Sequence, residues 1–328
     1  MHSEWQSFLQ QQSANSGEVL STQTLNNNII TDVSQLDVLK IGGNDAADFL
    51  HSQFSSDVSA LDIDELQLSS WCNIKGRVIA TFLLYRSHNA FYLILEKELT
   101  ESIVKRLQMF VMRAEVNITN QSDELIRIGI RGESVHAVLH EFIDTIKEDV
   151  RTSILSVPDA IPRSIVLLPL EQAQTLWQKL AEHAISKTSS HWSFYDIQAG
   201  IAWIGKMGSQ EFLPQSLNLD LCGGLSFDKG CYPGQEIIAR MHFRGKLKQR
   251  LFLIEVSVHK LPEIKTKLYS STAKQHVGMV VNTIMQANDS CLSLVTLDLE
   301  FFDKDAIHLG AQDGPALTFL PLPYSIDR

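Results

Sequence analysis

The chain has 328 residues, enough for roughly two domains, and 44% of them are hydrophobic, so it can bury real cores and is not a disordered protein. Its 28 Lys and Arg residues stand against 38 Asp and Glu residues, which gives a net charge of −10 and argues against non-specific coating of nucleic acid. A local basic site is still compatible with this balance.

Targeting segments and metal-binding patterns are also missing from the sequence. The longest apolar runs, such as residues 78–85, are far shorter than the ~20 residues of a membrane helix. The N-terminus lacks the basic start and apolar stretch of a signal peptide. Four scattered cysteines (Cys72, Cys222, Cys231 and Cys291) form no CxxC pair. We therefore expect a soluble, reduced, cytoplasmic protein with no membrane partner and no metal site of its own.

In chain order, residues 1–29 are expected to be a flexible tail, and the elements that follow alternate between strands and helices. The pattern predicts strands at 36–41, 78–86, 90–96, 114–119, 124–130 and 164–168. It predicts helices after Asn44 or Asp45 and at 97–113, 134–145 and 171–187. Two strands followed by a helix, repeated, are typical of an α+β fold rather than of regular βαβ winding.

The character of the chain changes after about Gly245. Strands are expected at 249–258, 277–285, 291–299 and 316–320, separated by Pro, Gly, Asn and Asp, and no convincing helix is found there. This pattern predicts a small all-β barrel or sandwich. The boundaries are thus a tail at 1–29, an α+β part at 30–245 and a β-barrel at 246–328.

The densest motif lies around Cys231. Gly230 and Gly234 flank this cysteine, and a helix whose buried side is Ile237, Ile238 and Met241 is expected to follow. A thiolate at a helix start is favoured by the helix dipole, and nearby Lys229 would add to this effect. The motif therefore indicates either a reactive thiol, or a ligand shared with a partner, or a tight turn whose thiol merely packs.

Two further features each have two interpretations. Six basic or titratable residues fall within eleven positions, at Arg240, His242, Arg244, Lys246, Lys248 and Arg250. They form either an anion site for a polyanion such as RNA or the solvated end of a helix. Trp192 stands at the entry of a predicted helix, where it either stacks on a flat heterocycle or packs against the helix.

Five stretches in this order resemble the YgfZ family. The central one is Lys229-Gly230-Cys231-Tyr232-Pro233-Gly234-Gln235-Glu236, followed by Arg240 and Arg244-Gly245. The others are Gly43-x-Asp45-Ala46 with Phe49-Leu50, Gln53 and Asp57-Val58; Lys75-Gly76-Arg77; Phe212-Leu213-Pro214-Gln215 with Asn218-Leu219; and Pro321-Leu322-Pro323-Tyr324-Ser325.

This family is similar to the aminomethyltransferase (T-protein) of the glycine cleavage system. The resemblance implies two α+β folate-binding subdomains and a C-terminal β-barrel, arranged as a ring around a central hole. It implies tetrahydrofolate or a derivative as the cofactor and a role in iron–sulfur cluster assembly or repair. Cluster assembly proteins or client enzymes would be the partners, the link to tRNA modification would run indirectly through iron–sulfur enzymes, and no direct DNA binding is expected.

The resemblance also implies roles for single residues. Cys231 would be the functional thiol, with Lys229 beside it, and Gly230 and Gly234 would shape the turn. The implied folate contacts are Trp192, Tyr232, Gln235, Glu236, Arg240 and Arg244. A second family tryptophan is replaced here by a residue at about Leu36.

The comparison with T-protein also predicts that a catalytic carboxylate is absent from this chain. T-proteins carry an assisting Asp on the strand after the first glycine turn, where this chain has Ala80 and Thr81. Neither can act as a general base near neutral pH, so we expect no glycine cleavage activity, and whether any reaction is catalysed stays open. The alternatives are a tetrahydrofolate-dependent one-carbon transferase for an unknown substrate and a non-catalytic scaffold stabilised by folate.

Overall fold

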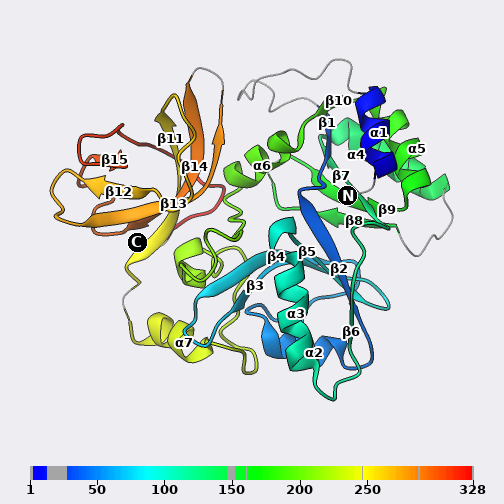
Figure 1. Ribbon diagram of the computed structural model, residues 1–328, viewed down its shortest axis with the longest axis horizontal. Coiled ribbons are helices and arrows are strands. Elements are labelled where there is room, and N and C mark those ends of the chain that lie inside the picture. The colour runs from blue at the N-terminus through cyan, green and yellow to red at the C-terminus, as the bar shows by residue number, and fades with distance from the viewer. Residues whose placement is uncertain are drawn as a thin grey trace.

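A computed structural model describes residues 3–12, 28–145, 152–159, 161–245, 247–286 and 289–326. Three sheets, each in its own lobe, organise the molecule (Figure 1). The first lies at the bottom of this view with α2 and α3, the second at the upper right with α1, α4 and α5, and the third at the upper left. Helices and strands are mixed in the first two lobes, so the predicted α+β class is confirmed.

The first sheet is antiparallel, in the order β3-β4-β5-β2-β6. Its strands are β2 (Leu36–Gly42), β3 (Leu66–Cys72), β4 (Val78–Arg86), β5 (Phe91–Glu96) and β6 (Asn117–Asn120). Its helices are α2 (Ala46–Gln53), the 3-10 helix η2 (Lys97–Leu99) and α3 (Thr100–Val111). Leu50 of α2 and Leu107 of α3 are fully buried against one face of this sheet, because apolar residues recur every three or four positions along both helices.

The second sheet has the order β10-β1-β7-β9-β8, with β1 parallel to β10 and the other pairs antiparallel. Its strands are β1 (Ile29–Asp32), β7 (Ile126–Arg131), β8 (Ser153–Ser156), β9 (Arg163–Leu168) and β10 (Ile185–Lys187). Its helices are α1 (Ser3–Gln12), α4 (Glu133–Thr145) and α5 (Leu170–Ala181). The helix predicted over 171–187 ends early because its last residues join the sheet as β10.

The flexible tail predicted at 1–29 is wrong for residues 3–12, which form α1. Trp5 is 1% exposed, its indole N–H donates to an Asp32 carboxylate oxygen at 2.9 Å, and its ring meets Trp177 edge-on at 5.5 Å. The Gln-rich composition hides the apolar face of this helix, which Trp5 shares with Phe8 and Leu9.

The remaining faces of the first two sheets pack against each other. Leu83 of β4 and Ile165 of β9 belong to the cluster between them, together with Trp192 of α6 (Ser189–Gln198). Helix α6 also contacts β1 of the second sheet and β13 and β14 of the third, so it lies where the lobes meet.

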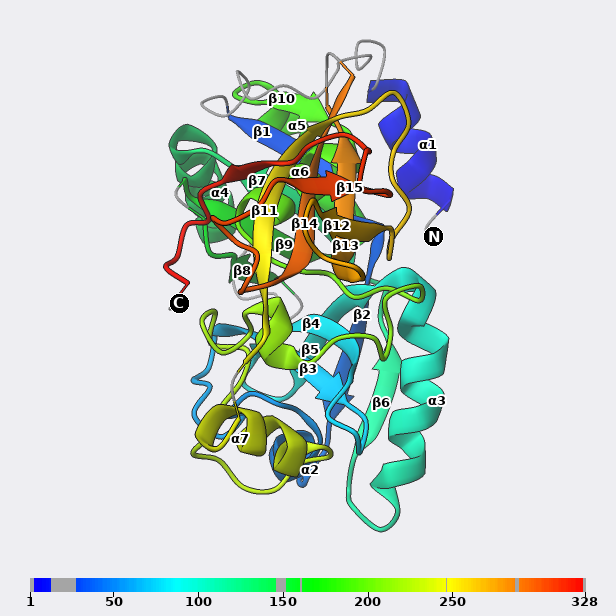
Figure 2. The same cartoon turned by 90° about the vertical axis from the view of Figure 1, so that its left-hand side faces the viewer.

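The third sheet is antiparallel and curled, in the order β15-β12-β13-β14-β11-β16, and faces the viewer in Figure 2. Its strands are β11 (Gln249–Ser257), β12 (Lys267–Ser270), β13 (His276–Met285), β14 (Ser290–Asp298), β15 (Ile307–Leu309) and β16 (Thr318–Leu320). The 3-10 helix η3 (Pro214–Leu217) and helix α7 (Gln235–Phe243) precede it. This curled sheet stands where a small barrel is predicted, whereas the domain boundary near Gly245 and the ring arrangement stay predictions.

Candidate functional site

A cavity of about 700 Å³ lies where the first two lobes meet the C-terminal segment. Its walls are mostly apolar, formed by Ala60, Leu61, Leu66, Leu68, Leu83, Pro158, Ala199, Ile201, Leu221, Gly223 and Pro323. The polar lining residues are Glu65, Gln67, Asp159, Cys222 and Tyr324. Ligand pockets for small organic molecules have volumes of roughly 300–1,000 Å³ and this same mixture of apolar walls and a few polar groups.

The polar groups of the cavity differ in how fully they are paired. The Gln67 side-chain amide donates to the Asp57 carbonyl at 3.3 Å, while its Oε1 is buried without a hydrogen-bond partner. Asp159 lies 3.1 Å from Nε of Arg163, so its carboxylate is already engaged by a cation. Burial raises the pKa of Cys222 to about 11, so this thiol stays protonated at neutral pH.

Trp192, predicted as a folate contact, is 1% exposed and is not among the residues that line this cavity. The Arg163 guanidinium lies 4.7 Å from its ring centroid, and a Cβ at Gly129 would come within 2.4 Å of the ring. Trp192 instead packs in the same cluster as Leu83 and Ile201, which do line the cavity. It therefore supports the wall from behind.

The motif around Cys231 packs against the turn between β3 and β4. Gly234 has a φ of +82°, and a Cβ there would lie 2.3 Å from the Asn73 carbonyl oxygen, so only glycine fits. Gly76 of this turn also lies close to Gly234, since its own Cβ would lie 3.2 Å from the Gly234 carbonyl oxygen. The Tyr232 backbone N–H donates to Oε1 of Gln235 at 3.2 Å and closes the turn.

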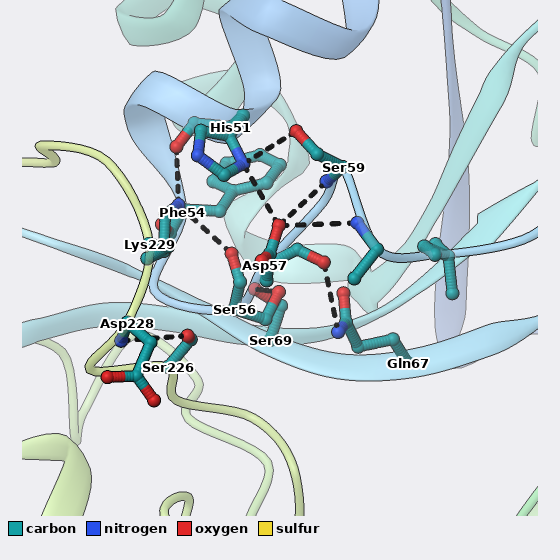
Figure 3. A network of polar contacts seen from close by, with 12 residues as sticks. His51, Phe54, Ser56, Asp57, Ser59, Gln67, Ser69, Ser226, Asp228 and Lys229 are labelled. Atoms are coloured by element: carbon teal, nitrogen blue, oxygen red, sulfur yellow. Dashed lines mark hydrogen bonds and ion pairs between the residues drawn. The ribbon is translucent and has the colours of Figure 1, made fainter.

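Lys229 is directed to helix α2 (Figure 3). Its ammonium donates to the carbonyls of His51, Phe54 (2.7 Å) and Ser56 (3.0 Å), at the C-terminal end of that helix. Burial lowers the pKa of Lys229 to about 8, while the negative charge of Asp57 acts in the opposite sense. The sequence predicts that Lys229 activates the Cys231 thiol, but the structure uses its donors to hold the motif against α2.

Cys231 is the exposed cysteine of the four. Cys72 and Cys291 are buried, and burial raises the pKa of Cys72 to about 12. Within the described part of the chain, no group of three or more His, Cys, Asp or Glu residues is placed to hold a metal ion. Cys231 is thus accessible to a partner, whereas the two buried thiols are not.

The basic stretch does not form one surface. Arg240 and Arg244 are exposed at the end of α7, while Arg250 is buried and pairs with Asp220 at 2.6 Å. His242 stacks on Phe227 with ring centroids 3.8 Å apart, and Lys246 lies outside the described residues. None of the predicted folate contacts Tyr232, Gln235, Glu236, Arg240 and Arg244 lines the cavity.

Known proteins resemble this chain over most of its length. The GCVT N-terminal domain family matches residues 7–155. The tRNA-modifying proteins YgfZ of Escherichia fergusonii and of Escherichia coli O6:H1 are each 29% identical to it over 297 residues, which are 88% of this chain and 90% of theirs. The resemblance to the YgfZ family is confirmed.

A solved structure agrees with the predicted fold. The aminomethyltransferase T of the glycine cleavage system from Bartonella henselae superposes with a TM-score of 0.68, covering 90% of this chain and 86% of that one. At 12% identity it shows the fold alone. The T-protein-like architecture predicted from the sequence is therefore confirmed.

The YgfZ-like stretches converge in space although they lie far apart in the sequence. The Gln215 side-chain amide donates to the Ile238 carbonyl of α7 at 2.8 Å, and Asn218 donates to the Leu251 carbonyl of β11 at 2.9 Å. Tyr324 donates to the Gly200 carbonyl at 3.3 Å. The stretches thus join α7, the third sheet and the C-terminal segment.

Sequence reasoning missed Gln67, His51 and Ser59. Gln67 lies on β3, which the pattern did not predict because two of its buried residues, Ser69 and Ser70, are polar. His51 and Ser59 lie beside quoted YgfZ-like residues but carry no spacing signal of their own.

No described helix has the length and apolar character needed to span a membrane.

Proposed function

We propose that this chain is a cytoplasmic folate-binding protein that supports iron–sulfur cluster assembly or repair and, through iron–sulfur enzymes, tRNA modification. The observation that carries the folate part is the apolar cavity with an unpaired buried acceptor, Gln67 Oε1, in a GCVT-type fold. The tRNA part is supported by the similarity to the tRNA-modifying proteins YgfZ, and the thiol part by the exposure of Cys231.

The cavity residues fit a reduced folate. Leu66, Leu83 and Ile201 offer apolar surfaces for the flat pterin. Gln67 Oε1 is an acceptor without a donor, and turning its side-chain amide into the cavity would let a pterin N–H supply one. A bound tetrahydrofolate would carry or accept one-carbon units there. Among the residues that the structure describes, no Lys or Arg lines the cavity, so we expect the carboxylates of the glutamate tail to remain in solvent at the mouth.

Isothermal titration with tetrahydrofolate tests the cavity. Gln67→Leu removes the acceptor and is expected to weaken binding roughly tenfold, because a buried hydrogen bond contributes about 1–1.5 kcal/mol. Gln35→Leu is the matched control, since Gln35 Oε1 is also buried and unpaired but Gln35 does not line the cavity. Equal affinities of the two variants, or no binding by the unmodified protein, would contradict the assignment. Trp192→Ala is a poor probe, because losing this buried ring costs about 3–5 kcal/mol of stability.

A complementation assay tests the thiol. Cys231→Ala is expected to abolish the support of iron–sulfur enzyme activities and tRNA thiolation in cells that lack the natural protein. Cys291→Ala, which removes a buried thiol of β14 in the third sheet, outside the cavity lining, serves as the control. Full activity of Cys231→Ala would overturn the thiol part while leaving the folate part standing.

One observation favours the transferase alternative, namely the carboxylate of Glu65 on the cavity wall, whereas the Asp159 carboxylate is already paired with Arg163. The hydrogen bonds of Thr81, which stands near the position of the T-protein Asp, count against the transferase alternative. Its hydroxyl donates to the Ala202 carbonyl at 2.7 Å and accepts from the Ile204 amide at 2.9 Å, so this hydroxyl is engaged within the fold. Formation of methylene-tetrahydrofolate from any aminomethyl donor would favour the transferase.

A further inference from the structure

Outside the cavity, His51 and its neighbour Asp57 lie beside the two residues that precede the motif cysteine. A Cβ built on Gly230 would lie 3.4 Å from Nε2 and 3.7 Å from Cδ2 of His51, so one edge of this imidazole faces the residue directly before Cys231. Consecutive Cα atoms are only ~3.8 Å apart. The Lys229 ammonium also donates to the His51 carbonyl. Lys229 therefore contacts His51, and Gly230 faces its imidazole.

The opposite edge of the imidazole is held by Asp57 and Ser59 (Figure 3). Nδ1 of His51 lies 3.3 Å from Oδ1 of Asp57 and 3.0 Å from Oγ of Ser59. The same Asp57 oxygen accepts the backbone N–H groups of Ser59 at 3.0 Å and Ala60 at 3.2 Å, which fix the carboxylate. A proton on Nδ1, directed at this carboxylate, leaves Nε2 as the nitrogen with a free lone pair.

The unprotonated nitrogen, Nε2 of His51, is partly exposed and has charged groups nearby. No described residue forms a hydrogen bond with Nε2 of His51, and the side chain is 21% exposed. The charged groups around it are Asp57 at Nδ1, Lys229 at its carbonyl, Asp48 one turn earlier on α2, and Asp228 next to Lys229. Since all three donors of Lys229 serve carbonyls, Nε2 of His51 is the acceptor left beside Gly230, and the exposed Cys231 side chain must turn toward it for a proton to pass.

We propose that His51 is the acid–base partner of Cys231 and that Asp57 positions it. The S–H bond of Cys231 breaks and its proton forms an N–H bond at Nε2, which leaves a thiolate beside an imidazolium; the reverse transfer restores the neutral pair. The thiolate is the form that attacks electrophiles and binds metal ions. Activated nucleophiles in proteins commonly combine a nucleophile, an adjacent base that takes its proton and a third group that orients the base. The proposal rests on the functional role proposed for Cys231.

Alkylation of Cys231 by iodoacetamide measures its thiolate directly and needs no activity assay. Trypsin cuts after Lys229 and Arg240, so residues 230–240 form a peptide whose single cysteine is Cys231. The alkylation rate is followed by mass spectrometry as a function of pH in the full-length protein. The variants are His51→Gln, which cannot take the proton, Asp57→Asn, and His259→Gln. The last is the matched control, because His259 lies 3.2 Å from Asp289 in a second His–Asp pair that is exposed to solvent.

In His51→Gln we expect the pH at which alkylation reaches half its maximal rate to rise by about one unit or more. Alkylation near neutral pH should be about threefold or more slower. Asp57→Asn should shift that pH in the same direction by less, and His259→Gln should leave it unchanged. A His51→Gln profile that superposes on that of the unmodified protein overturns the proposal. If His51→Gln unfolds, as judged by circular dichroism, Asp57→Asn decides in the same way, because it keeps the imidazole. Failure here leaves the complementation result for Cys231→Ala unaffected, so the two proposals fail separately.

Discussion

Lys229→Met tests whether the motif lysine holds helix α2. The substitution keeps the aliphatic stem and removes the ammonium, so the carbonyls of His51, Phe54 and Ser56 lose their donor. A hydrogen bond from a charged donor contributes about 1.5–3 kcal/mol, but three bonds that share one ammonium are not additive. Because Lys229 is only half-buried, water replaces part of the loss. We expect the end of α2 to lose about 2–3 kcal/mol of local stability.

Amide hydrogen exchange reports this loss where it occurs. The Phe54 N–H closes α2 by donating to the Leu50 carbonyl at 3.0 Å, and the Ser55 N–H donates to the Ser70 carbonyl at 2.9 Å. A loss of about 2–3 kcal/mol corresponds to roughly 30- to 150-fold faster exchange of these amides, while those of the third sheet should be unchanged.

The control and the refuting result are equally specific. Lys75→Met changes an exposed lysine of the nearby β3–β4 turn, whose ammonium has no partner in the described part of the chain, and should alter exchange by less than about threefold. If Lys229→Met leaves the exchange of Phe54 and Ser55 within that same range, Lys229 does not hold α2. Its donors would then be available to the Cys231 thiol, as the sequence predicts.

Three further substitutions test single contacts. Burial raises the pKa of Glu96 to about 7, and the charges of Glu98 and Asp196 add to the effect. Between about pH 4.5 and 7 the folded chain therefore holds a proton that the unfolded chain releases. The free energy of unfolding falls as the pH rises through this window. Glu96→Gln should therefore be about 1–3 kcal/mol more stable than the unmodified protein at about pH 8 and nearly equal to it at about pH 5 in urea unfolding, and equal midpoints at the higher pH would contradict this. The Cβ of Gly129→Ala would meet the Trp192 ring at 2.4 Å, so this variant should lose about 1–3 kcal/mol of stability. In the control Gly42→Ala the nearest atom lies at 3.8 Å, so its stability should change by less than about 0.5 kcal/mol. Similar thermal midpoints of the two variants would show that the ring can move aside. Gly234→Ala combines a φ of +82° with a clash against the Asn73 carbonyl, whereas at Gly223 φ is +73° but no atom lies within 4 Å of an added Cβ. Gly234→Ala should therefore destabilise the protein by about 1–3 kcal/mol more than Gly223→Ala. Equal losses of stability would mean that backbone strain alone matters.

Local spacing in the sequence was sufficient for most of the secondary structure. The apolar residues of α3 recur every three or four positions, and those of β4 form a continuous run, so both elements are recognisable within a few residues. Strands β8 and β10 escaped because they have only four and three residues, and β3 escaped because its buried residues Ser69 and Ser70 are polar. Helix α1 escaped because Gln-rich composition masks the few apolar residues that bury it.

The motif around Cys231 was likewise visible in the sequence, because its glycines and its resemblance to the YgfZ family are local features. Only the tertiary structure decided what its neighbours do. Lys229 and His51 are 178 positions apart, and no periodicity relates them, yet the fold brings the ammonium onto the carbonyl. Trp192 could equally have faced a ligand or a core, and its 1% exposure decided for the core. Burial and the pairing of charges depend on segments that meet only after the chain has folded, so the sequence indicated the thiol and the structure decided its surroundings.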